Sequence, residues 1–301
     1  MQRMFSATSV LDSFVGASGN TLVADIYGDS GPPVLLLHGG GQTRRSWRGA
    51  AITIARSGRR AISVDQRGHG DSEWVAGGEY RNTDFAADIR RIAVQLFARY
   101  GARPVAVTAS FSGISSLLAE AGHRKETGQN LLAGFFIVDM AITNATEGAE
   151  RVAAFMLADA RAGFASVEEA ADSVARYLGR PRPANLQGLQ KNLRQGQDGR
   201  WRWHWDPCFM DGPLNIKSDR DAVHADMIAT LRDTLLPVLL VRGASSDVML
   251  EEHIVELQRT APHVRYVNVA GAHHMVVGEE NDSFTQALLG FLDAADAMRA
   301  T

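Results

Sequence analysis

The sequence has little cysteine and almost no surplus charge. Cys208 is the only cysteine among 301 residues, so neither an intrachain disulfide nor a zinc site that needs two thiolates is available. The 31 basic residues against 34 acidic ones give a formal charge of -3 and leave no surplus positive charge to neutralise phosphates, so we expect neither nucleic acid nor an anionic membrane as a partner. We therefore expect a small, uncharged or weakly charged ligand, no metal or cofactor, and a cytoplasmic location.

Long apolar runs are also absent. No stretch of about 18 apolar residues occurs, and the N-terminal residues MQRMFSATSV lack the apolar segment of an export signal. We expect a protein that is neither exported nor membrane-spanning. The 45% of hydrophobic and 22% of charged residues are typical of a globular chain that buries its own core.

Short apolar runs rich in branched residues alternate with longer segments of helical period, as in a mostly parallel sheet flanked by helices. Residues 13–28 alternate apolar and polar positions around a turn, which predicts an antiparallel hairpin at the sheet edge. The other strands are expected at residues 34–37, 61–64, 105–107, 135–138, 238–241 and 264–269. Helical spacing is clearest over 84–100 and again over 284–291. The predicted fold class is α/β, with about eight strands.

One interval breaks this alternation. Residues 144–234 separate two predicted strands, and a structureless loop of that length is rare inside a domain. We therefore predict a core formed by residues 1–143 and 235–301, with an inserted helical lid at 144–234. Within it, Trp201, Trp203 and Trp205 share one parity, so an extended segment would turn them to one side.

A serine follows the predicted strand at 105–107, in the run Thr108-Ala109-Ser110-Phe111-Ser112-Gly113. Small residues around a serine on a strand-to-helix turn are typical of a nucleophile that is presented above a sheet. Ser110 fits this pattern better than Ser112, which would place the branched Ile114 where the turn has little room. The alternative is a serine that only caps the helix.

These residues resemble the α/β-hydrolase family, from about residue 21 to the C-terminus, although the family usually has glycine where this chain has Thr108 and Ser112. The family commonly places a histidine-glycine turn after its first parallel strand, and His38 to Gly41 stand there. The resemblance implies an oxyanion hole formed by the amides of Gly40 and Phe111. A phosphate-binding loop is the rival, but no Gly-Lys-Ser/Thr follows Gly41.

A second segment, Asp65-Gln66-Arg67-Gly68-His69-Gly70-Asp71-Ser72, matches an architectural segment of the same family. We expect Asp65 and Arg67 to bind turn amides and each other. His38 and His69 are expected to be structural.

A serine needs a base to take its proton and an acid to orient that base. Alignment of Gly271 with the family's glycine-x-glycine-histidine pattern implies His274 as the base, with His273 as the alternative. Asp247, after the strand at 238–241, is the expected acid. Asp139 is the reserve, because some family members use that position.

The predicted reaction is hydrolysis of a carboxylic ester or lactone of a small to medium hydrophobic substrate through an acyl-enzyme. The expected catalytic residues are Ser110, Asp247 and His274, and the expected substrate-binding residues are Gly41, Trp47, Trp201, Trp203, Trp205 and Met275. The sequence leaves open whether the protein forms a homodimer.

Other functions on this fold remain alternatives. Ser110 argues against dehalogenases and epoxide hydrolases, whose nucleophile is aspartate. Dienoate-type carbon-carbon hydrolases share the glycine turn and the serine, but they typically carry tryptophan where this chain has Met275. A cofactor-free perhydrolase or haloperoxidase uses the same triad, and a non-catalytic ligand receptor is a further alternative.

Overall fold

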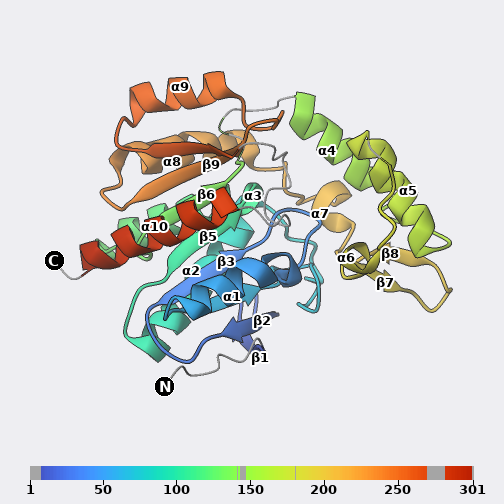
Figure 1. The fold of residues 1–301 in the computed structure, drawn as a ribbon, viewed down its shortest axis with the longest axis horizontal. Helices are drawn as coiled ribbons and strands as arrows, with labels where there is room; N and C mark the ends of the chain where they lie inside the picture. The colour runs from blue at the N-terminus through green and yellow to red at the C-terminus, as the bar shows by residue number, and fades with distance from the viewer. Residues whose placement is uncertain (1–7, 141, 143–146, 180, 270–281, 300–301) are drawn as a thin grey trace.

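The computed structural model describes residues 8–140, 142, 147–179, 181–269 and 282–299. An eight-stranded sheet in the order β1-β2-β4-β3-β5-β6-β9-β10 forms its centre (Figure 1). The strands are β1 (Val10–Val15), β2 (Thr21–Tyr27), β3 (Pro33–Leu37), β4 (Arg60–Val64), β5 (Val105–Ala109), β6 (Phe135–Val138), β9 (Val238–Gly243) and β10 (Arg265–Val269). β2 pairs antiparallel with β1 and β4, and the other pairs are parallel. The predicted α/β fold class is confirmed.

The sheet is covered on both faces because its central strands are apolar at consecutive positions. Leu35 and Leu37 of β3 pack on one side, and Val34 and Leu36 pack on the other. The first side carries α2 (Asn82–Tyr100), α3 (Phe111–Thr127), α8 (Arg220–Asp233) and α9 (Glu251–Thr260). The second carries α1 (Arg48–Arg56) and α10 (Asp282–Arg299). Successive side chains of a strand therefore point to opposite faces of the sheet, and this alternation helps to fix the register of the parallel strands.

Helix α2 confirms the helix predicted over 84–100 and begins two residues earlier, at Asn82. Asp84, the residue predicted to start the helix, lies in its first turn instead. Its carboxylate accepts from the backbone N–H of Arg81 at 2.9 Å and so caps the start of the helix. Gly101, at φ 70°, ends the helix in the left-handed conformation. None of the described helices combines the length and apolar character needed to cross a membrane.

The segment between β6 and α8 lies to one side of the sheet (Figure 1). It contains α4 (Glu147–Ala158), α5 (Val167–Leu178), α6 (Gln187–Gln190), α7 (Cys208–Asp211) and the hairpin of β7 (Leu193–Gln195) and β8 (Trp201–Trp203). Its apolar side chains form a third cluster together with Tyr80, Phe85 and Phe111. Helix α8, although inside the range predicted for the lid, contributes Val223, Met227 and Leu231 to the core of the sheet.

Candidate active site

Ser110 lies between the end of β5 and the start of α3. Its backbone has φ 56° and ψ -128°, a conformation that residues other than glycine rarely adopt. Its N–H donates to Val138 O at 2.8 Å, which ties the turn to β6. The side chain forms no capping hydrogen bond with α3, so the alternative of a capping serine does not fit. Strain of this kind is typical of functional turns.

Ser112 is held in the core instead. Its side chain is fully buried, and its Oγ accepts from Ala109 N at 2.9 Å and lies 3.0 Å from Leu37 O, a carbonyl to which it can donate. A Cβ on the next residue, Gly113, would lie 2.7 Å from Ile137 Cγ2. Close packing against β6 therefore explains the small residues after Ser110, and it leaves Ser110 as the accessible hydroxyl.

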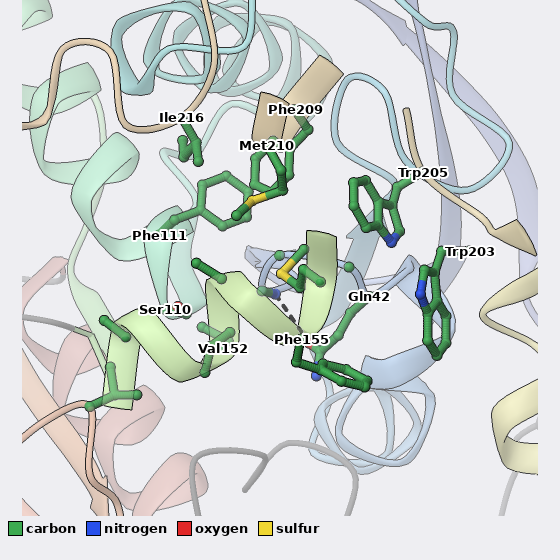
Figure 2. A pocket seen from close by; sticks show the side chains of 18 of the residues that line it. Gln42, Ser110, Phe111, Val152, Phe155, Trp203, Trp205, Phe209, Met210 and Ile216 are labelled. Carbon is green, nitrogen blue, oxygen red and sulfur yellow. Dashed lines mark hydrogen bonds between the residues drawn. The ribbon is translucent and has the colours of Figure 1, made fainter. Parts of the chain in front are cut away.

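The glycine turn lines the same cavity as Ser110. A Cβ on Gly39 would lie 3.6 Å from Ser110 Cβ, so the turn and the serine are in close approach. Gln42 holds the turn, because its Oε1 accepts from Gly39 N at 3.1 Å (Figure 2). Gly41 has φ 74°, where only glycine is unstrained. At the start of α3, the Phe111 amide is one of the N–H groups that the helix itself cannot pair.

Two buried histidines hold the glycine turn in place. Burial lowers the pKa of His38 to about 4 and that of His69 to about 3, so both rings are neutral near pH 7. The Nε2 atom of His69 accepts from Gly41 N at 3.4 Å, and that of His38 accepts from Gln66 N at 3.1 Å. The histidines therefore act as hydrogen-bond acceptors for the backbone, in line with their predicted structural role.

The predicted pair between Asp65 and Arg67 is wrong, because each side chain pairs elsewhere. Asp65 forms a buried ion pair with Arg44 and accepts from Asp71 N at 2.9 Å. Arg67 donates from Nε and Nη2 to the Asp88 carboxylate at 2.6 and 2.8 Å. The two pairs anchor the start of the segment 65–71 and the bond from Asp71 N ties its end to Asp65, which is the architectural role that its residues indicate.

The two candidate acids have different surroundings. Asp139 directly follows β6, is 1% exposed, and accepts from Ser246 Oγ at 2.6 Å. Its φ of 48° makes it, with Ser110, one of the two residues other than glycine with a positive φ in the described part of the chain. The side chain of Asp247 is 48% exposed and forms an ion pair with Arg151 of α4.

The expected base, His274, lies outside the described residues, as do Gly271, His273 and Met275. Strand β10, which precedes them, ends at Val269 beside Gly243 of β9. The chain therefore leaves β10 at the edge of the sheet from which Ser110 and Asp139 also emerge.

A cavity of about 280 Å³ opens beside Ser110 (Figure 2). Its wall is largely apolar and includes Trp203 and Trp205, as predicted. Trp201 packs in the third cluster without lining the cavity, and Trp47 is fully buried against α1 and the other face of the sheet. Proximity in sequence to the glycine turn suggested a pocket position for Trp47, but the turn at Arg44–Trp47 directs it into the core.

Sequence reasoning missed several residues of the wall. Phe155 and Met156 of α4 and Met210 of α7 line the cavity, and they also pack in the third apolar cluster. Polar residues that had no motif to indicate them also line it: Gln42, Asn82, Asn192, Lys217 and Arg220. Apolar helical spacing identifies an inward face, but it does not tell a packed interior from a cavity wall.

The alpha/beta hydrolase family matches this chain over residues 34–287, and the chain belongs to that family. Its relatives include an esterase of Mycobacterium tuberculosis, 27% identical over 274 residues that cover 89% of this chain and 85% of the relative. A 2-(acetamidomethylene)succinate hydrolase of Mesorhizobium japonicum is 28% identical, with 88% and 89% covered. The crystal structure of an E-2-(acetamidomethylene)succinate hydrolase shares the fold, with a TM-score of 0.75 at 24% identity over 95% of this chain and 99% of that one.

Proposed function

We propose that the protein is a serine hydrolase that cleaves a carboxylic ester or lactone of a small to medium hydrophobic substrate through an acyl-enzyme. The main support for this proposal is the backbone of Ser110. Its strained strand-to-helix turn leaves a hydroxyl that does not cap α3 beside a largely apolar cavity. The name of the mycobacterial relative, an esterase, supports ester chemistry.

The oxyanion hole is proposed at the amides of Gly40 and Phe111. Gly39, Gly40 and Gly41 border the cavity without side chains, so a substrate carbonyl can approach the main chain closely. The amide of Phe111 opens the 17-residue helix α3, whose N-terminal dipole favours negative charge. Main-chain donors held in place before the reaction stabilise the charge that develops on the carbonyl oxygen.

We propose Asp139 as the acid of the triad, in preference to Asp247. Asp139 follows β6 directly, next to the strand that presents Ser110, and its buried carboxylate is oriented by Ser246. A buried carboxylate interacts more strongly with an imidazolium than one in water does. Asp247 is half exposed and already neutralised by Arg151, so it is less suited to that role.

The proposed cycle uses His274 as the base. The Oγ atom of Ser110 attacks the ester carbonyl while His274 takes its proton, and the tetrahedral intermediate collapses as His274 returns that proton to the leaving alcohol. A water molecule then loses a proton to His274 and attacks the acyl-enzyme, and the second tetrahedral intermediate collapses to the free acid as His274 returns that proton to Ser110 Oγ. The acid holds the imidazole in orientation and stabilises its charged form throughout.

Labelling with a fluorophosphonate ester tests this proposal, because such probes modify serines that a neighbouring base activates. We expect one label for each chain, located at Ser110 by mass spectrometry. Ser110→Ala should remove the label, while Ser245→Ala, at an exposed serine after β9, should retain it. A folded wild-type protein that stays unlabelled, or a label on another serine, would contradict the assignment.

A further inference from the structure

The cavity beside Ser110 carries positive charge at one end. Among the described residues that line it, Lys217 and Arg220 are charged, and none is an aspartate or a glutamate. Arg220 is the first residue of α8, and Lys217 lies three positions before it, where the chain returns to the core. The whole chain has a formal charge of -3, so this local excess of cations is a property of the site.

Arg220 is partly withdrawn from water. Burial lowers the pKa of its guanidinium from the ordinary value, and the adjacent Asp221 offsets only part of that effect. The carboxylate of Asp219 is directed to α2, where it accepts from Asn82 Nδ2 at 2.9 Å and from Thr83 Oγ1 at 2.8 Å. A partly desolvated guanidinium on a wall whose described residues include no acid favours an anionic ligand, and a planar carboxylate matches its geometry.

Asn82 adds a polar group at the same end. Its side chain lines the cavity and its residue is only 2% exposed. The Nδ2 atom donates to Ile216 O and to Asp219 Oδ1, both at 2.9 Å, which fixes the orientation of the amide. The Oδ1 atom has no hydrogen-bond partner within the described part of the chain. Asn82 therefore offers a ligand no free donor, and its role is to fix the segment 216–219, which carries Lys217 and leads into Arg220.

The other end of the cavity carries aromatic rings. Figure 2 shows Phe155 and Trp203 on the side away from Ile216, which lies beside Phe111. The ring centroids of Phe155 and Trp203 are 5.9 Å apart, in an edge-to-face contact. A ligand that spans the cavity therefore meets aromatic rings at one end and cations at the other.

We propose that Lys217 and Arg220, on a segment that Asn82 holds in place, form a carboxylate-binding subsite, so that the preferred ester carries a free carboxylate on the side of α8. This inference rests on the proposed ester hydrolysis and narrows its substrate class. It also narrows the expectation of an uncharged or weakly charged ligand to one with a negative charge, which the net charge of the whole chain could not indicate.

Monoethyl and diethyl esters of adipic, glutaric and succinic acids test the preference, with hydrolysis followed by titration of released acid. We expect the wild-type protein to favour at least one monoester over its diester by about tenfold or more in kcat/KM. Arg220→Gln should reduce that ratio at least about fivefold. Arg232→Gln, on the same helix but exposed and paired with Asp233, should leave the ratio unchanged. Equal ratios in wild type and Arg220→Gln would overturn the subsite while leaving ester hydrolysis intact.

Calorimetry on Ser110→Ala tests the subsite without turnover. We expect monoethyl adipate to bind at least about tenfold more tightly than diethyl adipate, and Arg220→Gln in this background to remove the difference. If no ester is hydrolysed and Ser110 is not labelled, the proposed function fails, and this binding comparison still decides on the subsite. Equal affinities for the two esters in the Ser110→Ala protein would refute it.

Discussion

Two regions meet at the cavity, and different forces hold them. The edge loops, residues 38–42, 65–70 and 108–113 together with Asp139, are fixed by hydrogen bonds among buried polar groups. The cap, residues 147–216, packs through aromatic contacts, such as the stacked rings of Phe155 and Tyr177 at 4.4 Å. Directional bonds fix positions closely, whereas apolar packing tolerates changes of shape more readily. The edge loops are therefore suited to chemistry, and the cap is suited to selecting substrates.

The two candidate acids lie on opposite sides of this division. Asp139 belongs to the buried network of the edge loops, through Ser246. Asp247 faces the cap, where a Cβ on Gly148 of α4 would lie 2.4 Å from its carbonyl oxygen and where Arg151 pairs with its carboxylate. If the division is correct, removing the charge of Asp139 disables the reaction, whereas removing that of Asp247 loosens the cap.

Acidification should lower the free energy of unfolding through the two buried histidines of the edge loops, His38 and His69. His38 and His69 have folded pKa values of about 4 and about 3, against about 6.5 in an unfolded chain. The unfolded chain therefore binds these protons first, and the stability they provide is complete above about pH 6.5 and falls as the pH drops toward the folded values. Each histidine accounts for up to about 1.4 kcal/mol per pH unit, so the free energy of unfolding should fall by roughly 2 to 3 kcal/mol between pH 6 and 5.

Urea denaturation, followed by tryptophan fluorescence across that pH range, measures this loss. His69→Gln keeps an acceptor for Gly41 N but cannot be protonated, so its stability should vary less steeply with pH. His263→Gln changes an exposed histidine and should retain the wild-type dependence. A His69→Gln protein with the same slope as the wild type would show that burial of this ring does not set the acid limit.

A smaller effect is expected on the cap side. Trp203 lines the cavity and packs edge-to-face on Phe164, with ring centroids 5.3 Å apart. Trp203→Ala removes apolar surface from the wall, so KM for a p-nitrophenyl ester of an eight-carbon acid should rise by about tenfold, with little change for the acetate. Trp201→Ala, on the same strand but outside the cavity wall, is the matched control. A uniform fall in kcat for both esters would mean that the cap also positions the reacting groups.

The sequence predicted the fold and the tight turn at Ser110 because both depend on local patterns. Short continuous apolar runs located the parallel strands, and small residues around Ser110 indicated a tight turn, which the packing of Gly113 against β6 explains. The glycine turn beside Ser110 was predicted in the same way, from glycines directly after a strand.

Features that depend on packing between distant segments were beyond that reasoning. Helix α8 has a spacing that fits a lid or a core equally well, and only its contacts with α3 place it in the core. Asp139 and Asp247 both follow a strand, so burial and ion pairing were needed to tell them apart. Lys217 and Arg220 carry no motif, and their shared cavity wall follows from the return of the chain to the sheet.

The most direct test of the account compares kcat for p-nitrophenyl butyrate in Asp139→Asn and Asp247→Asn, with folding of each variant checked by circular dichroism. We expect Asp139→Asn to lose about 10³-fold or more, because the imidazole loses the charge that orients and stabilises it, and Asp247→Asn to lose less than about tenfold. The reverse order, with a large loss in Asp247→Asn and little in Asp139→Asn, would contradict the claim that the buried edge loops supply the acid.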